Sequence, residues 1–327
     1  MSNIAALRAK LQASAQKGDQ TARSKGSGGD NASFPFWDIP VGQSATIRFL
    51  PDADPTNDYF WVKREVIKLP FAGVVGGEYP TDKDVTVTVP CIDMFGMKCP
   101  IVAATKYLWD KDETKDLARV YWKKRSWIFQ GLVVNSPLNE ENAPENPIRR
   151  FVINKSIYDI VYEALLDPDL DNMPTDYDGG LDFTIKKTQK GEWANYGTST
   201  FARKSRSLSE VERSAIDANG LFNLKDALGA VPSGDAIEAM KQMLKDSMDG
   251  LPYDMESFGQ YFRPYGSRDS GGTAPAASQT RSTPSAAQSE TQVETASAAA
   301  SSDEGGSSNA KAILERLRVR TANRDAE

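Results

Sequence analysis

The chain has 327 residues, with 39 Lys and Arg, 45 Asp and Glu, two Cys and no His. The lack of His excludes Ser-His-Asp and Cys-His catalytic pairs and any His-ligated zinc site. Two cysteines cannot form a disulfide framework or a four-cysteine zinc site. No run approaches the ~20 apolar residues of a membrane helix, and no signal-peptide core opens the sequence, so we expect a soluble intracellular protein without membrane contact.

The net charge of −6 is unevenly distributed along the chain. Residues 1–33 carry a net charge of +3, residues 34–265 a net charge of −8, and residues 266–327 a net charge of −1. An acidic protein binds nucleic acid poorly unless its cations gather on one face, because a ligand responds to the local field. Whether this protein can bind nucleic acid therefore depends more on where its cations lie than on its net charge.

The N-terminal region divides into two predicted segments. Residues 1–17 are Ala-rich and basic, and the spacing of Leu7 and Leu11 predicts a short amphipathic helix. Residues 18–33 are mostly small, polar and charged, which predicts a flexible linker. All 30 aromatic residues follow within residues 34–265, so we expect the folded domain there.

The C-terminal region is poor in apolar residues until its last stretch. Residues 266–309 are mainly Ser, Ala, Gly, Thr, Gln and Pro, which predicts a disordered linker. Residues 310–327 regain helix formers, with Ile313, Leu314 and Leu317 on one side. This pattern is typical of a tethered helix that binds a protein partner, and a tail without a partner is the alternative.

Within the folded domain, strand patterns precede a run of helical patterns. β-branched and aromatic residues predict strands at 44–50, 59–69, 85–89, 126–134, 149–153 and 181–187. Helical patterns cover 114–119, 155–166, 209–219, 223–230 and 235–249. The order predicts a mainly β protein with helical additions: an oligonucleotide-binding (OB) fold, meaning a five-stranded, partly open barrel, with a small inserted subdomain and a C-terminal helical cap.

Three segments of this acidic domain combine cations with aromatic rings. Residues 119–127 hold four cations and three aromatics, residues 149–155 start with two arginines and a phenylalanine, and residues 186–206 hold six cations and one acid. Single-stranded nucleic acid is bound by such combinations, because cations follow the phosphates while bases stack on rings. The alternative for each segment is that the rings belong to the core and the cations form a solvated edge.

The sequence also resembles a known family over about residues 44–205. The resemblance is carried by Ala45-Thr-Ile-Arg-Phe-Leu-Pro51, by Lys123-Lys-Arg-Ser-Trp127, by Pro144-Glu-Asn with Lys155-Ser-Ile-Tyr-Asp159, and by Trp193-Ala-Asn-Tyr196. These segments, in this order, are similar to the replicative single-stranded DNA-binding (helix-destabilising) proteins of T-even-type phages. The resemblance implies an OB-fold whose cleft pairs basic residues with rings.

Two arguments together nominate the residues that would contact single-stranded DNA. The resemblance implies DNA contacts for Arg48, Lys123, Lys124, Arg125, Trp127, Phe151, Lys155, Trp193 and Tyr196, and it places Tyr107, Tyr121 and Trp122 near tyrosines of the family. The cation-rich segments add Arg119, Arg149, Arg150, Lys186 and Lys187.

The sequence departs from the family where the family binds zinc through one His and three Cys. Cys91 and Cys99 match two of these cysteines, the third falls at Val102, and no His exists. Asp93 stays open as an extra ligand, but two cysteines are too few for structural zinc. We therefore expect a subdomain without zinc and a protein without a cofactor.

The resemblance also implies self-association along the strand through the N-terminal arm. Only the helix with Leu7, Arg8, Lys10 and Leu11 remains of that arm, so we expect these residues to bind a neighbouring subunit. The family's acidic C-terminal tail is replaced by the nearly neutral tail with its apolar helix face, which we expect to bind replication and recombination proteins.

These features predict a non-enzymatic protein that coats single-stranded DNA, without sequence preference and cooperatively, during phage DNA replication, recombination and repair. The expected location is the cytoplasm of an infected bacterial host. Three alternatives stay open: an adaptor of a phage or replisome assembly, an RNA-binding OB-fold protein, and a metal-dependent nuclease.

Overall fold

The computed structural model describes residues 4–15, 32–78, 80–140 and 143–264. The predictions for most of the N-terminal linker, for the linker 266–309 and for the helix with Ile313, Leu314 and Leu317 lie outside these residues, as does the side chain of Lys10. No described helix has the length and apolar character needed to cross a membrane.

The described residues form two compact units whose segments alternate along the chain. Unit 1 takes the described residues of Met1–Ile67, Pro90–Cys99 and Lys123–Val231. Unit 2 takes those of Lys68–Val89, Pro100–Trp122 and Pro232–Glu327.

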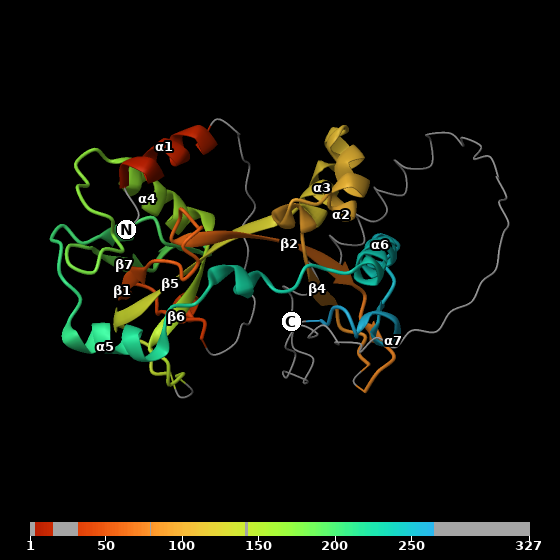
Figure 1. Ribbon diagram of the computed structural model, residues 1–327. Helices are drawn as coiled ribbons and strands as arrows, with labels where there is room; N and C mark the ends of the chain where they lie inside the picture. Colours follow the sequence, from red (N-terminus) through yellow and green to blue (C-terminus); the bar gives the residue numbers. More distant parts are fainter. Residues whose placement is uncertain (1–3, 16–31, 79, 141–142, 265–327) are drawn as a thin grey trace, which may run out of the picture. The chain divides into compact units, whose positions relative to one another are not determined.

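A large antiparallel sheet is the main feature of the fold (Figure 1). Its strands are β1 (Ser44–Leu50), β2 (Trp61–Phe71), β4 (Val85–Pro90), β5 (Lys124–Asn135), β6 (Ile148–Ile153), β7 (Asp182–Lys186) and β10 (Thr200–Phe201). They run in the order β10-β7-β1-β5-β2-β4, and β6 pairs with β5 off this path. The strands predicted at 44–50 and 149–153 are confirmed within one residue, while β2 begins and ends two residues later than its pattern.

Helices are more extensive than the predicted helical additions, so the structure is mixed α and β rather than mainly β. They are α1 (Ile4–Ala15), α2 (Pro100–Thr105), α3 (Lys115–Tyr121), α4 (Lys155–Leu166), α5 (Glu210–Asn219), α6 (Gly234–Met248) and α7 (Met255–Phe258), with 3₁₀ turns η1 (Phe36–Asp38), η2 (Ile92–Phe95), η3 (Lys106–Trp109), η4 (Asp112–Thr114) and η5 (Leu224–Leu228). The helix predicted at 223–230 is only the short η5, because Asn223 caps its start and Gly229 ends it at a φ of 79°.

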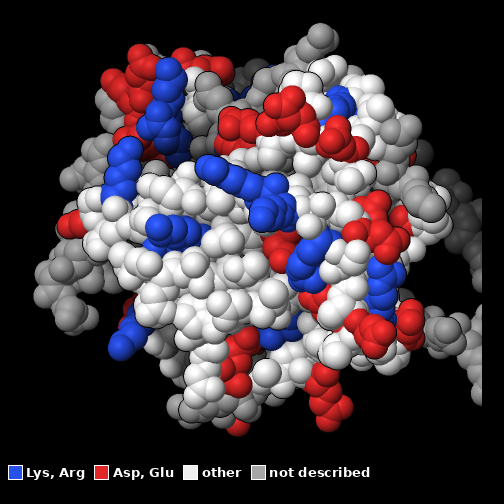
Figure 2. Space-filling view, turned by 90° about the vertical axis from the view of Figure 1, so that its left-hand side faces the viewer, with Lys and Arg blue, Asp and Glu red and all other residues white. Residues whose placement is uncertain are grey.

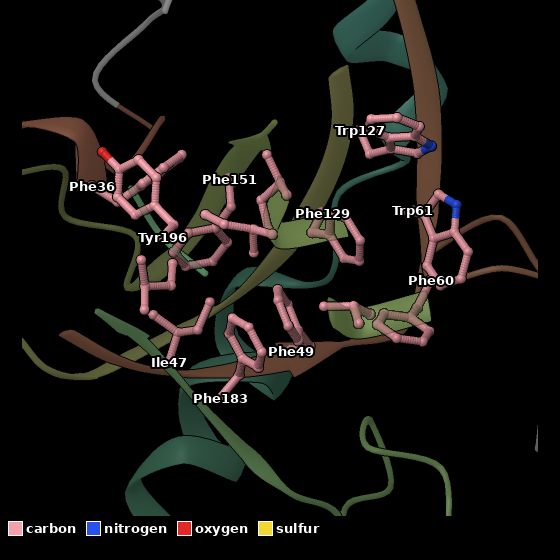
Figure 3. Close-up of a cluster of buried hydrophobic side chains, with 14 of the residues drawn as sticks. Phe36, Ile47, Phe49, Phe60, Trp61, Trp127, Phe129, Phe151, Phe183 and Tyr196 are labelled. Carbon is pink, nitrogen blue, oxygen red and sulfur yellow. The ribbon is translucent and has the colours of Figure 1, made fainter. Parts of the chain in front are cut away.

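The core of unit 1 lies on one face of the sheet (Figure 3). Ala45, Ile47 and Phe49 alternate along β1 and point into it, as a period of two requires. The ring of Phe49 lies 4.9 Å from that of Phe129 and 5.5 Å from that of Phe183. Helix α4 covers this cluster with its apolar stripe, and the side chain of Asn154 caps the start of the helix by accepting from the N–H of Ile157.

A second apolar layer of unit 1 covers Leu50, on the opposite face of β1. Leu50, Leu132 and Ile148 from three neighbouring strands pack against Leu208 and Ile216 at α5. This covering segment follows β1 by roughly 160 residues in sequence, so both faces of the central strands are buried.

Unit 2 is built from α2, α3 and α6 together with β4 and the far end of β2. This unit also contains a short parallel strand pair, β3 (Val74–Val75) with β11 (Tyr253–Asp254). The buried Tyr121 hydroxyl lies 3.2 Å from the Ser247 hydroxyl, which donates to the carbonyl of Pro70 at 2.6 Å. Tyr121 is therefore a core residue of this unit.

Candidate nucleic-acid interface

A short hairpin in unit 1 presents the most exposed tryptophan among the described residues. Strands β8 (Thr188–Lys190) and β9 (Trp193–Asn195) pair through Lys190 and Trp193 across a two-residue turn. Gly191 begins this turn at a φ of 62°, which glycine adopts without strain. The side chain of Trp193 is 65% exposed, and Lys190 and Lys186 are exposed beside it in sequence.

The root of this hairpin is firmly held. The Lys187 ammonium donates to the carbonyl of Trp37 at 2.6 Å, and the Thr188 hydroxyl donates to the carbonyl of Asn195 at 3.0 Å. Tyr196 is buried, with its ring 5.6 Å from that of Phe36, and burial raises the pKa of its phenol. Both Trp193 and Tyr196 were predicted to contact DNA, but only Trp193 is exposed.

Cations mark the surface of unit 1 on the side where β7 and α5 lie in Figure 1. Figure 2 shows Lys and Arg side chains spread over the middle of this face, while Asp and Glu side chains lie mainly toward its edges. The exposed cations of the segment 186–206, which contains the hairpin, are Lys186, Lys190, Arg203 and Lys204. The net negative charge of the chain therefore does not describe this face.

Trp127 was predicted to stack on bases, but one face of its ring is already occupied. The ring of Tyr158 lies parallel to it at 3.9 Å, with 6° between the planes, and Trp127 is only 6% exposed. Tyr158 is half-buried and also contacts Trp61, at 5.7 Å between ring centroids. Tyr158 is therefore the outer ring of this pair.

Lys63 lies beside this aromatic pair and was missed by the sequence reasoning, as was Tyr158. Lys63 pairs with Trp127 across β2 and β5, so the two side chains share one face, and the Lys63 side chain is 46% exposed. The alternation of Trp61, Lys63 and Glu65 within the predicted strand was the signal that could have found it.

A cluster of charged groups follows on the same face of β2 and β5. The buried carboxylate of Glu65 accepts from the Lys123 ammonium and the Arg125 guanidinium, each at 3.0 Å, and pairs with the Lys63 ammonium at 3.0 Å. Lys123 also donates to Asp93, at 3.0 Å. Burial alone would raise the pKa of Glu65 and lower that of Lys123, but these contacts outweigh it, so the pKa of Glu65 is lowered and that of Lys123 is raised.

The two cysteines lie next to this cluster. Cys91 and Cys99 are buried as thiols, and a hydrogen bond between these thiols, together with burial, raises the pKa of Cys91. Ligand atoms of Glu65, Cys91 and Asp93 lie within 4.8 Å of one another, a set of donors that could hold a metal ion. The Lys123 ammonium bonds to both carboxylates of that set.

Six predicted DNA contacts are buried, Trp127 and Tyr196 among them, which contradicts a surface role for these residues in this structure. Arg48 is 0% exposed and donates to Asp182, at 3.1 Å, and to two backbone carbonyls. Arg149 forms a buried ion pair with Glu140, at 2.7 Å. Phe151 lies in the core of unit 1 and Tyr121 in that of unit 2. The two arginines in this group bond to acceptors inside the protein, which offsets the cost of burying their charge.

The remaining predicted contacts are partly or fully exposed. Lys124, Arg125, Arg150, Lys155 and Lys187 of unit 1 are half-buried, as are Lys123 and the unit 2 residue Trp122. Tyr107 and Arg119 of unit 2 are exposed, with Arg119 paired to Asp116 at 2.6 Å. Within unit 1 the structure brings the predicted residues together in two places, the β8–β9 hairpin and the start of β5.

Helix α1, expected to bind a neighbouring subunit, packs on α4 of its own unit (Figure 1). Leu7 and Leu11 are buried in the core cluster, and the Tyr162 hydroxyl donates to the carbonyl of Leu11 at 2.8 Å. The Arg8 guanidinium donates to the carbonyls of Leu165, at 2.8 Å, and Leu170, at 2.7 Å, beyond the end of α4. Contact with a neighbour through these residues would require α1 to leave this position.

Comparison with family profiles and with curated proteins found no match to the chain.

Proposed function

We propose that this protein binds single-stranded DNA without sequence preference. The observation that carries the proposal is Trp193, which is 65% exposed on an anchored hairpin and pairs across its strands with the exposed Lys190. A large ring held in solvent offers a face to a base, and stacking contributes about 1–3 kcal/mol per base. The lysines beside it supply the charge that follows the phosphates, which is the main source of affinity for a polyanion.

A second contact region of the proposed interface is the edge formed by Tyr158 and Lys63. Tyr158 offers the outer ring of its pair with Trp127, and Lys63 adds an exposed cation beside it. We propose further that the antiparallel strands β1, β2, β5, β6 and β7 form the five strands of an OB-fold, whose open face is a common surface for single strands.

The proposed role is to coat single-stranded DNA during replication, recombination and repair in a phage-infected bacterial cell. A protein that binds single strands and not duplex lowers duplex stability by mass action, so hairpins are removed without catalysis. Cooperative coating would use α1 after it leaves α4, and residues 310–327 would recruit replication proteins.

Fluorescence titration of the full chain with oligo-dT tests this proposal. We expect tryptophan quenching, and Trp193→Ala should weaken binding by about 1–3 kcal/mol, or roughly 5- to 150-fold. Trp193→Phe should retain most of the affinity, and Val211→Ala, at an exposed apolar residue of α5, should leave it unchanged. Absence of quenching at low salt, or equal affinity for duplex DNA, would contradict the proposal.

The same titration separates two of the alternatives, the RNA binder and the adaptor. Equal or tighter binding of oligo-U would make the protein an RNA binder, because stacking tolerates either sugar. An adaptor would ignore both oligonucleotides and would retain its protein partner after nuclease treatment.

A further inference from the structure

The donor set of the buried Glu65 and Cys91 and the partly exposed Asp93 has the composition of a divalent-metal site. Two carboxylates and one thiol lie close enough for a single ion to bridge all three, and the Cys99 thiol contacts that of Cys91. The backbone N–H of Cys99 donates to the second oxygen of Asp93, at 2.9 Å, which fixes the orientation of this carboxylate. Metal sites are commonly supported by such outer contacts.

A side chain of the protein itself occupies the position that an ion would take. The ammonium of Lys123 lies 3.0 Å from Oε2 of Glu65 and 3.0 Å from Oδ2 of Asp93. Its side chain is only 14% exposed, so the charge is held inside the cluster and is not displayed on the surface. The other oxygen of Glu65 is already neutralised by Lys63 and Arg125.

We infer that Lys123 is the resident cation of this cluster and takes the place of a divalent metal ion. One ammonium ties the carboxylate of Asp93, in the loop that carries both cysteines, to the carboxylate of Glu65 on β2. The buried carboxylate of Glu65 and the partly exposed carboxylate of Asp93 would repel each other without a cation between them, so the ammonium of Lys123 keeps both in their charged form. With lysine in this role, the loop does not depend on metal supply.

It follows that the chain carries a set of metal ligands that becomes available only when the Lys123 amine is removed. Removal of the Lys123 amine leaves Oε2 of Glu65, Oδ2 of Asp93 and Sγ of Cys91 facing one another without their cation. A soft divalent ion such as Zn²⁺ or Co²⁺ would then bind these three donors, with water completing the coordination, and the Cys91 thiol would release its proton to solvent as the sulfur–metal bond forms.

Cobalt titration of the full-length chain tests this inference. Wild type should show no thiolate-to-cobalt absorption band, and its melting temperature should not change on addition of EDTA. Lys123→Ala should melt at a lower temperature, should develop the band at one equivalent of Co²⁺, and should regain stability with Zn²⁺. The double variant Lys123→Ala/Cys91→Ser should lose the band, which identifies the sulfur ligand.

Lys63→Ala is the matched control, because it removes a lysine from the same carboxylate of Glu65 but leaves the ammonium between Glu65 and Asp93. It should gain no cobalt band. Stoichiometric cobalt or zinc binding by wild type would overturn the inference. So would a Lys123→Ala chain, or a Lys123→Gln chain of similar side-chain length, that neither binds metal nor regains its fold when metal is added.

Discussion

The guanidinium of Arg48 lies in the interior of unit 1, where it satisfies three acceptors at once. Arg48 is 0% exposed in its pair with Asp182, whereas the Arg119 side chain, paired with Asp116 on α3, is 63% exposed. Removing one partner of a buried ion pair typically costs about 3–5 kcal/mol, while exposed pairs contribute about 0–1 kcal/mol. The two arginines should therefore contribute very differently to stability, although each pairs with an aspartate.

Arg48→Ala should lower the free energy of unfolding by about 3–5 kcal/mol, whereas Arg119→Ala should lower it by less than about 1 kcal/mol. Urea denaturation followed by circular dichroism at pH 7 measures both. A stable Arg48→Ala protein whose only defect is a flatter salt dependence of DNA binding would instead support the surface contact predicted from sequence.

The burial of Arg48 could not be read from its own segment. Alternation along residues 44–50 predicts one apolar face, and Ala45, Ile47 and Phe49 confirm it. The same alternation leaves Arg48 on the other face, which is covered only by residues such as Leu208 and Ile216, far away in sequence. The burial of Trp127 could not be predicted for a similar reason. Its stacking partner Tyr158 comes from a helix whose position the strand pattern does not determine.

At the scale of elements, α5 shows how one carboxylate can serve both a helix start and a distant strand. Ser209 and Glu212 form a capping box, in which the Ser209 side chain accepts from the N–H of Glu212 and the Glu212 carboxylate accepts from the N–H of Ser209. The same carboxylate pairs with Arg206, which in turn pairs with Asp182 of β7. Hydrogen bonds from Arg206 are the main cause that lowers the pKa of Glu212 to about 2.

Glu212 should therefore make the stability of unit 1 depend on pH in the acid range. A carboxyl whose pKa is lower in the folded than in the unfolded protein stabilises the fold above its ordinary pKa. This contribution is lost as pH falls from about 4.5 toward the folded value of about 2. Glu212→Gln should be less stable than wild type at pH 7, and the difference in urea midpoint should shrink steadily toward pH 2.

Glu210→Gln is the matched control for this prediction, because Glu210 is exposed in the same first turn of α5. It should keep the acid dependence of wild type. A Glu212→Gln protein with an unchanged urea midpoint at pH 7 would show that the capping box and the Arg206 pair contribute no net stability.

Elements with strong local patterns were predictable, and those defined by their packing were not. Residues 155–166 form α4 as predicted, since the apolar stripe and the Asn154 cap both lie within the segment. The short helix α2 has no such stripe, and it gains its place from packing against α6 in unit 2. Helix α1 was predicted correctly as a helix, but sequence could not tell that Leu7 and Leu11 would pack on their own unit.

At the scale of the whole chain, the negative net charge gives no indication of the cationic surface on unit 1. The sequence predicted exposed cations and rings in segment 186–206, and the structure exposes Lys190 and Trp193 on the hairpin and Lys186 at the end of β7. The sequence could not separate exposed from buried cations elsewhere, since Arg149 and Lys123 bond to acids that come from other segments. Local charge is thus a better guide than net charge when the cations and rings share one element.

If the hairpin binds DNA, Lys190 on its first strand and Lys186 at the end of β7 should contribute to the salt dependence of binding. For single strands, the slope of log affinity against log salt is about −0.7 for each phosphate contact. The double variant Lys186→Gln/Lys190→Gln should therefore flatten the slope for oligo-dT by about 1.4. Fluorescence titrations between low and moderate salt, with all variants kept at the same pH, measure this change.

Lys241→Gln/Lys245→Gln provides a control with the same change in net charge. Both of its lysines are exposed on α6 of unit 2, a helix to which neither the sequence nor the structure assigns a DNA contact. If only the hairpin variant flattens the slope, the affinity depends on local phosphate contacts. If both variants flatten it equally, the protein responds to net charge alone, and the hairpin loses its assigned role even where Trp193 still quenches.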